Sequence, residues 1–405
     1  MRELLRHRDF RLLLAGQTLS MFGDTALFLA LGVWVKQLTG SNGAAGAVFL
    51  VLALPYVFAP FGGLLVDRVR RRPLMITVDL VTAAAVLLLL FVHNRGDLWL
   101  IFAVAALYGA SQLVFESARS ALVFTLLPAE LLDTGNAALS TVRQGLRLVG
   151  PLVGIGIYAR YGGGVTAALD AATFLASATA LLAMQLREAR PAAREHRIRT
   201  ELAAGARHLV RTPTLRRLVL ALAAAMGVVG FSESTIFAVV QHGLRRPPTF
   251  LGVVSTIQGV GAVAGGLSAT RVTRRIGTTR LVGAGLLAAG AGAGLTAASG
   301  LLVVGFGVAL FGLALPWVII GFTTTLQRET PAHLQGRAYS AADMAFSIPQ
   351  TASIGVGALL VGLVDYRLLL AAMAVVLAGS AASLAGVRRT ASTASPATAA
   401  EVGGT

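Results

Sequence analysis

Residues 62–72 read Gly62-Gly63-Leu64-Leu65-Val66-Asp67-Arg68-Val69-Arg70-Arg71-Arg72 and separate two long apolar segments. Paired glycines allow two helices to approach closely, and clustered arginines favour the cytoplasmic side of a membrane. A weaker copy at residues 265–275 has the same paired glycines and a similar cluster of arginines, with Thr270 in place of the aspartate. A duplicated loop between apolar segments indicates a membrane protein made of two related halves.

The composition also places the chain in a membrane. Of its 405 residues, 56% are hydrophobic and 13% are charged, which is too apolar for a soluble protein with an ordinary core. The net charge of +16 would suggest nucleic-acid binding in a soluble protein. Here the basic residues lie in short turns between apolar segments, where they set the topology. We therefore expect a lipid bilayer and no nucleic acid as partner. The absence of cysteine excludes disulfides and thiolate metal sites.

Twelve segments are long and apolar enough to cross a membrane, which takes about 20 residues as a helix. They are residues 11–36, 42–66, 74–93, 98–122, 137–159, 163–186, 216–240, 249–270, 280–298, 301–326, 340–363 and 367–387. If both termini are cytoplasmic, most of the 34 Lys and Arg residues fall on that side, and the other side receives only Lys36, Arg95, Arg160, Arg245, Arg246 and Arg367. The positive-inside rule therefore predicts cytoplasmic N- and C-termini in a multi-pass protein of the cell (cytoplasmic) membrane.

One long hydrophilic connection divides these segments into six and six. We expect an N-terminal six-helix half at 1–186, a cytoplasmic linker at 187–215, a C-terminal six-helix half at 216–389 and a disordered tail at 390–405. The duplicated loop follows the second segment of each half, which indicates parallel repeats. The predicted fold class is an all-α membrane protein with twelve transmembrane helices in two pseudo-symmetric six-helix bundles.

These features resemble the major facilitator superfamily over essentially the whole chain, which implies its two-bundle fold. The loop matches the signature of that family through Gly63, Asp67, Arg68, Arg71 and Arg72, and departs from it at Arg70, where glycine is usual. The resemblance implies a cytoplasmic gating loop in which Asp67 faces the start of the eleventh helix, around residues 341–343. The alternative is an aspartate anchored only by Arg71 or Arg72.

The fifth segment carries a second motif, formed by Gly145, Gly150, Pro151 and Gly154. It resembles the Gly-Pro motif of proton-coupled antiporters in the same superfamily, which implies export. Residues 10–17, 22–24 and 170–174 further resemble the macrolide-efflux and enterobactin-exporter branch. A simple kink is the alternative role for these Gly and Pro residues, because both are common in membrane helices.

Two acids lie near the middle of equivalent segments. Asp24 shares a helix face with Gln17 and Ser20 in the first segment, and Glu233 lies in the seventh. An ionisable group inside a membrane is costly and is therefore a functional candidate. We expect both acids to flank a central cavity and at least one to bind the coupling proton or a cationic substrate, because burial favours the neutral form of a carboxyl group. A hydrogen bond to a neighbouring helix is the alternative role.

The fourth and fifth segments carry four more charged residues. At a rise of 1.5 Å per residue, Glu116 and Arg143 each lie roughly 10 Å inside the cytoplasmic surface, which predicts an ion pair. This pair either changes partners during transport or only neutralises buried charge. Arg147 lies deeper, where it can meet an anionic substrate. Arg119 and Arg143 are candidates to replace the Arg-x-x-Gln-Gly feature of other drug exporters, which the fourth segment lacks.

Other residues are assigned by position. Asp79 and Asp170 lie nearer the ends of their segments and Asp343 near a helix start, so we expect structural roles for them. The expected aromatic residues of the cavity wall are Phe22, Phe28, Phe115, Phe231, Phe237 and Trp317. Such a wall favours a partly apolar substrate.

The sequence therefore predicts a transporter and not an enzyme. It contains no Gly-x4-Gly-Lys-Ser/Thr loop for ATP and no catalytic constellation, and we expect no cofactor and no metal. The predicted function is proton-coupled efflux of a small amphipathic molecule, such as a drug, an antibiotic or a siderophore-like compound, by a monomer using alternating access. A proton-coupled uptake symporter and a non-transporting receptor or assembly partner are the alternatives.

Overall fold

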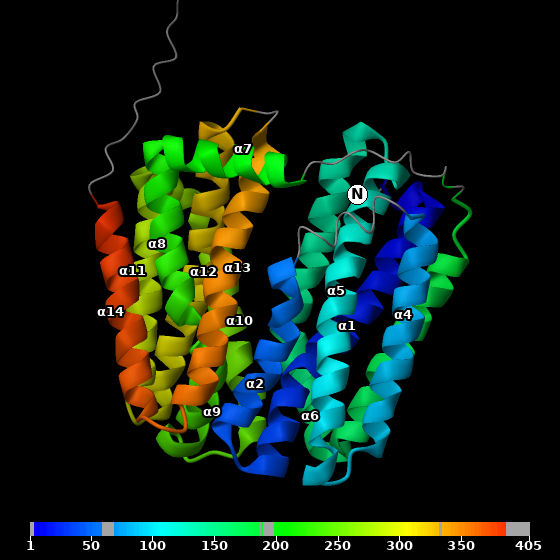
Figure 1. The fold of residues 1–405 in the computed structure, drawn as a ribbon, viewed down its shortest axis with the longest axis horizontal. Coiled ribbons are helices and arrows are strands. Elements are labelled where there is room, and N and C mark those ends of the chain that lie inside the picture. Colours follow the sequence, from blue (N-terminus) through cyan, green and yellow to red (C-terminus); the bar gives the residue numbers. More distant parts are fainter. Residues whose placement is uncertain (1–3, 59–68, 187, 189–197, 332–333, 386–405) are drawn as a thin grey trace, which may run out of the picture.

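The computed structural model describes residues 4–58, 69–186, 188, 198–331 and 334–385. Within these ranges the chain is almost entirely helical and contains no strand. Figure 1 shows two helical bundles side by side, with the N-terminal part of the chain in one and the C-terminal part in the other. The predicted fold class is confirmed at this level.

The N-terminal bundle contains α1 (Arg8–Thr39), α2 (Asn42–Ala53), α4 (Arg71–Leu87), α5 (Leu98–Leu126) and α6 (Ala129–Leu182). Helix α1 packs along α6, and α4 packs on α5 and α6. Short 3₁₀ helices at Leu54–Phe58 and Leu88–Phe91 continue α2 and α4. The expected fifth and sixth segments both fall in α6, which is broken at Gly162, where φ is +81°. Glycine tolerates this conformation because it has no Cβ.

The C-terminal bundle contains α8 (Pro213–Val229), α9 (Ser232–Ala238), α10 (Leu251–Ile276), α11 (Thr278–Thr296), α12 (Leu301–Glu329), α13 (Gln335–Leu360) and α14 (Tyr366–Leu384). Helix α11 packs against α12 and α14, while α13 packs against α8. A short π-helix at Val239–Gly243 continues α9. The tight turn between α10 and α11 is made by Gly277, where φ is +87°.

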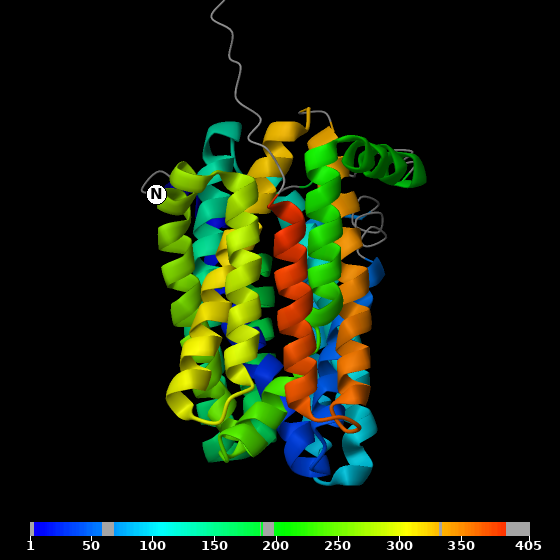
Figure 2. The ribbon, with the colours of Figure 1, turned by 90° about the vertical axis from the view of Figure 1, so that its left-hand side faces the viewer.

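The predicted linker contains a helix of its own, α7 (Ile198–Arg211). Figures 1 and 2 show α7 lying across one end of the C-terminal bundle, at the end where the N-terminus also lies. It packs against α13 and α8. Gly205 lies so close to the Arg337 backbone that a side chain at residue 205 would overlap the Arg337 carbonyl group.

Eight helices of the described ranges are long and apolar enough to cross a membrane, by length and composition. The other expected segments fall on α2, the first part of α6, α11 and α13, which are shorter or less apolar; the arrangement is consistent with twelve crossings. Helix α13 begins at Gln335, not at residue 340, because a helix can extend beyond its apolar part. The expectation that Asp343 lies at a helix start is therefore wrong, since it lies two turns inside α13.

Small residues bring the helices into close contact, as is usual where lipid offers no hydrophobic reason for helices to associate. Gly154 of α6 lies against the backbone of Ala26 in α1. Between the two bundles, Gly46 of α2 lies against Ser234 of α9, and Gly252 of α10 lies against Ile155 of α6. Helices α2 and α9 lie toward the end of the molecule opposite α7 (Figure 1), so the two bundles touch at that end.

Candidate transport site

A cavity of about 760 Å³ lies between the two bundles. Its size falls within the roughly 300–1,000 Å³ of typical sites for small organic ligands. Both bundles contribute to its walls, with α1, α2, α5 and α6 on one side and α8, α9, α12 and α13 on the other. Its aromatic residues are Phe28, Phe49, Tyr56, Tyr108, Phe322, Tyr339 and Phe346.

Only Phe28 of the six aromatic residues expected on this wall lines the large cavity. Phe237 is instead buried in the core, with its ring centroid 6.1 Å from that of Phe49. The Trp317 indole donates to the Gly265 carbonyl oxygen at 3.0 Å, which joins α12 to α10. Phe22 and Phe231 do not line the cavity either, and Phe115 borders a smaller one. Periodicity identifies a polar or apolar helix face, but it does not identify the neighbour of that face.

Three charged side chains line the large cavity without partners. Arg147 of α6 lies on the N-terminal wall, while Glu233 of α9 and Asp343 of α13 lie on the C-terminal wall. None of the three side chains forms a hydrogen bond or an ion pair with any residue in the described part of the chain. The cavity therefore presents a positive group on one wall and negative groups on the other.

Asp24 does not line the large cavity. Its Oδ1 atom accepts a hydrogen bond of 2.5 Å from the Tyr108 hydroxyl group, and Tyr108 lines the large cavity. Together with Gln17, Asp24 lines a second cavity of about 20 Å³ inside the N-terminal bundle. Of the two acids expected to flank the central cavity, the structure places Glu233 on its wall and Asp24 behind Tyr108.

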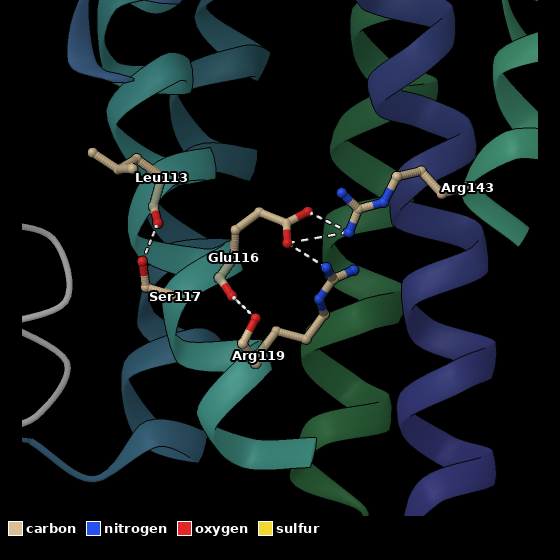
Figure 3. A network of polar contacts seen from close by, with 6 residues as sticks. Leu113, Glu116, Ser117, Arg119 and Arg143 are labelled. Atoms are coloured by element: carbon tan, nitrogen blue, oxygen red, sulfur yellow. Dashed lines mark hydrogen bonds and ion pairs between the residues drawn. The ribbon is translucent and has the colours of Figure 1, made fainter. Parts of the chain in front are cut away.

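Glu116 forms the centre of a charged cluster with two arginines (Figure 3). Its Oε1 atom lies 2.9 Å from Nη2 of Arg143, so the predicted ion pair is present. Its Oε2 atom also pairs with Arg119, one turn along α5. The Arg119 side chain is 7% exposed, whereas those of Glu116 and Arg143 are 34% and 37% exposed. The pairing of Glu116 with Arg119 was not predicted, although their spacing of three residues allows it.

The two described arginines of the gating loop, Arg71 and Arg72, form hydrogen bonds within the N-terminal bundle. Nε and Nη2 of Arg72 donate to the carbonyl oxygens of Leu181 and Leu182 at 2.7 and 2.8 Å. Arg71 donates to the Thr125 hydroxyl group at 3.1 Å. Arg72 therefore caps the C-terminal end of α6, where the helix dipole favours a positive charge. Gly63, Asp67 and Arg68 lie outside the described residues, so the expected contact of Asp67 with the eleventh helix stays a prediction.

The Gly-Pro motif lies where α6 crosses α1. Gly150 lies against the side chain of Thr25 and Gly154 against Ala26, so neither position has room for a side chain. Pro151 lies inside the helix. Gly145 faces open space, and close packing therefore does not explain that position.

Two acids with expected structural roles are more deeply buried than their positions suggested. Asp79 and Asp170 are each 1% exposed. The Asp170 side chain lies against Gly23 and close to the Thr173 hydroxyl group. Asp79 lines the small cavity together with Thr82. The spacing of three residues between Asp79 and Thr82 in an apolar segment was a usable signal, because it places both on one helix face.

Two bundles of membrane-length helices with a ligand-sized cavity between them are the arrangement of a membrane transporter. The Major Facilitator Superfamily pattern matches residues 13–354. The chain belongs to this superfamily, and it is a transporter, not an enzyme.

Similar proteins agree with this assignment. The chain is 25% identical over 362 residues to the uncharacterized MFS-type transporter YfiS of Bacillus subtilis (strain 168), covering 86% of this chain and 85% of that protein. It is 29% identical over 147 residues to Macrolide efflux protein A of Streptococcus pyogenes, covering 36% of each.

Solved structures share the fold at low sequence identity. A bacterial homologue of the iron transporter ferroportin, in an inward-facing state, has a TM-score of 0.73 at 16% identity, covering 93% of this chain and 98% of that chain. A point mutant of the nucleoside transporter NupG has a TM-score of 0.74 at 12% identity, covering 93% of this chain and 99% of that chain.

Proposed function

We propose that this protein exports a small amphipathic organic molecule in exchange for protons, by alternating access across the cytoplasmic membrane. The observation that carries the proposal is the cavity of about 760 Å³ between the bundles, which combines aromatic walls with unpartnered charged side chains. The Gly-Pro motif in α6 and the partial similarity to Macrolide efflux protein A support the outward direction.

The charges of the cavity favour a substrate that carries groups of both signs or a cationic group. Arg147 can bind an anionic group, while Glu233 and Asp343 can bind a cationic one. Charge-assisted hydrogen bonds are stronger than neutral ones, and aromatic rings bind the apolar part of a ligand and attract cations. A drug, an antibiotic or a siderophore-like compound of amphipathic shape meets these requirements.

The arginine distribution supports cytoplasmic termini, with α7 on the cytoplasmic side. In this orientation the cavity reaches toward the cytoplasm near Tyr339, which lies one turn after the start of α13. The contact of Gly46 with Ser234 lies toward the outer end. We therefore assign the conformation as inward-open, with the halves 1–186 and 216–389 moving about the linker 187–215 in a monomer.

Protons supply the driving force in this proposal, with Asp24 or Glu233 as the first candidates for the coupling acid. A proton that crosses down 100 mV releases about 2.3 kcal/mol. This free energy supports a concentration ratio of roughly fortyfold for a neutral substrate, since about 1.4 kcal/mol corresponds to tenfold.

The test is the accumulation of ethidium, erythromycin and a ferric siderophore in cells that express the wild type or Asp24→Asn. The wild type should exclude at least one compound, and a protonophore should abolish the exclusion. Cells that express Asp24→Asn at the same level as the wild type should accumulate this compound. Asp365→Asn is the matched control, because Asp365 is exposed and asparagine can also accept the hydrogen bond from the Arg367 backbone.

The outcomes separate the alternatives. Full export by Asp24→Asn would remove Asp24 from the coupling mechanism. Gradient-dependent uptake by the wild type would replace the exporter with a symporter, and the direction can be confirmed in inside-out vesicles. If no compound moves and no gradient matters, a receptor or assembly role would replace transport.

A further inference from the structure

The second cavity, of about 20 Å³, lies inside the N-terminal bundle and is distinct from the cavity between the bundles. We call it the inner chamber. Helices α1, α4, α5 and α6 form its walls, and its polar lining residues are Gln17, Ser20, Asp24, Asp79, Thr82, Ser111, Gln112 and Glu116. About 10–15 Å³ of such volume is enough for one water molecule, provided that it has two to four polar partners. The inner chamber meets both conditions.

Among the residues that line the inner chamber, Asp79 is the one whose burial is not explained by any contact described above. It is 1% exposed, and neither of its carboxyl oxygens forms a hydrogen bond in the described part of the chain. The Ser177 hydroxyl group lies near it, but it too lacks a hydrogen-bond partner of normal geometry. A buried carboxylate without a partner is very costly. Asp79 therefore needs a proton, or a ligand in the chamber that it lines.

The groups around Asp79 do not neutralise it. Asp24 of α1 and Glu116 of α5 line the inner chamber with Asp79, and Asp170 of α6 lies near Asp24 outside it. The two arginines of α5 and α6 in this region, Arg119 and Arg143, are paired with Glu116. Among the described residues, no cationic side chain forms an ion pair with Asp79. A buried carboxyl group that has no cation paired with it favours the bound proton.

We propose that the inner chamber is a proton-binding site, in which one water molecule links Asp24 to Asp79 and Asp79 holds the transported proton. In the transfer, the protonated Asp24 carboxyl group gives its proton to the water, and the water gives one of its protons to the Asp79 carboxylate. Asp24 is left ionised and the water is regenerated. This inference rests on the proposed proton-coupled function and assigns the proton to a residue outside the substrate cavity.

The separation of the two spaces has a mechanistic consequence. Proton and substrate do not compete for the same atoms, because Asp79 lines the inner chamber and not the large cavity. Two residues of α5 connect them: Gln112 lines both spaces, and Tyr108 lines the large cavity and donates a hydrogen bond to Asp24. A substrate that displaces the Tyr108 hydroxyl group would change how strongly Asp24 holds its proton.

The first experiment measures protonated carboxyl groups by infrared spectroscopy of the full chain in lipid, without substrate. The wild type should show a carboxylic-acid C=O band near neutral pH that Asp79→Asn lacks and that Asp365→Asn retains. Identical spectra of the wild type and Asp79→Asn would overturn the proposal. Loss of the band on addition of sodium chloride at constant pH would also overturn it, because the chamber would then hold a sodium ion.

The second experiment measures ethidium transport in proteoliposomes. Asp79→Asn should retain ethidium exchange without a gradient and lose the accumulation that a pH gradient drives in the wild type. Asp170→Asn is the matched control, because Asp170 is equally buried in the same bundle but does not line the chamber; it should retain both activities. If Asp79→Asn does not fold, Ser111→Val serves instead, since it keeps every carboxyl group and fills the chamber that Ser111 lines.

The failures are distinguishable. Gradient-driven accumulation by Asp79→Asn at the wild-type level would overturn the inference and leave the proposed function intact. Loss of accumulation in Asp170→Asn but not in Asp79→Asn would also overturn it, by assigning the proton to α6. If the wild type accumulates no ethidium under a gradient, the proposed coupling fails for this probe, and the infrared bands still decide whether Asp79 is protonated.

Discussion

Replacing Glu116 with glutamine should destabilise the N-terminal bundle far more than replacing Arg143 with glutamine. Glu116 pairs with both Arg119 and Arg143. In Glu116→Gln the Arg119 guanidinium group, whose side chain is 7% exposed, loses its counter-ion. Nη1 of Arg119 is already buried without a hydrogen-bond partner. In Arg143→Gln, by contrast, the pair between Glu116 and Arg119 stays intact.

The magnitudes follow from the exposure of each partner. Removing one partner of a buried ion pair costs about 3–5 kcal/mol, and because Glu116 is 34% exposed we expect the lower end for Glu116→Gln. The partly exposed pair with Arg143 contributes at most about 1 kcal/mol. The two variants should therefore differ by about 2 kcal/mol in the free energy of unfolding. At about 2–4 °C per kcal/mol for a unit of bundle size, their Tm values should differ by roughly 4–8 °C.

The assay is thermal unfolding of the purified protein in detergent, followed by tryptophan fluorescence. Trp34 and Trp99 lie in the N-terminal bundle and report on it. Arg160→Gln is the control for the loss of a positive charge, because Arg160 is exposed on α6; surface changes of this kind cost less than about 0.5 kcal/mol. Equal Tm shifts for Glu116→Gln and Arg143→Gln would refute the argument, since they would mean that burial of Arg119 does not decide the cost.

Two further predictions concern packing and substrate choice. Gly154→Val should lower the Tm and the folded yield, with a cost of about 1–3 kcal/mol, because its Cβ would overlap Ala26; Gly156→Val, at a site facing open space on the same helix, should change neither. Arg147→Gln should weaken binding of anionic or zwitterionic compounds by about tenfold or more, since a hydrogen bond to a charged group contributes about 1.5–3 kcal/mol. It should leave ethidium binding unchanged, and equal weakening of both classes in binding titrations would contradict this role.

The pair of Glu116 and Arg143 shows how far positional reasoning reaches. Both residues were placed at equal depth on consecutive helices, and the structure brings their charged groups to 2.9 Å. Equal depth in the membrane was sufficient to predict this ion pair because consecutive helices of opposite direction lie side by side. The same reasoning failed for Asp343, because apolarity marks the part of a helix in lipid and not its first residue.

Asp79 and the aromatic residues of the cavity show that position along a helix does not predict which neighbours a side chain contacts. Asp79 lies near one end of its segment, yet α5 and α6 bury it. Phe49 and Phe322 line the large cavity, whereas Phe237 faces the core. A helical period groups residues on one face, but the rotation of the helix against its neighbours decides what that face meets.

By itself the sequence determined the membrane class, the two-half organisation and the superfamily, because apolar length, arginine placement and loop motifs are local properties that need no partner. Only the tertiary structure decided that Asp24 lies behind Tyr108, that Arg147 faces Glu233 and Asp343 across a cavity, and that Asp79 lines a separate chamber. Each of these relations joins residues from different helices. Their geometry depends on how whole helices pack, which close contacts such as that of Gly154 with Ala26 fix in three dimensions.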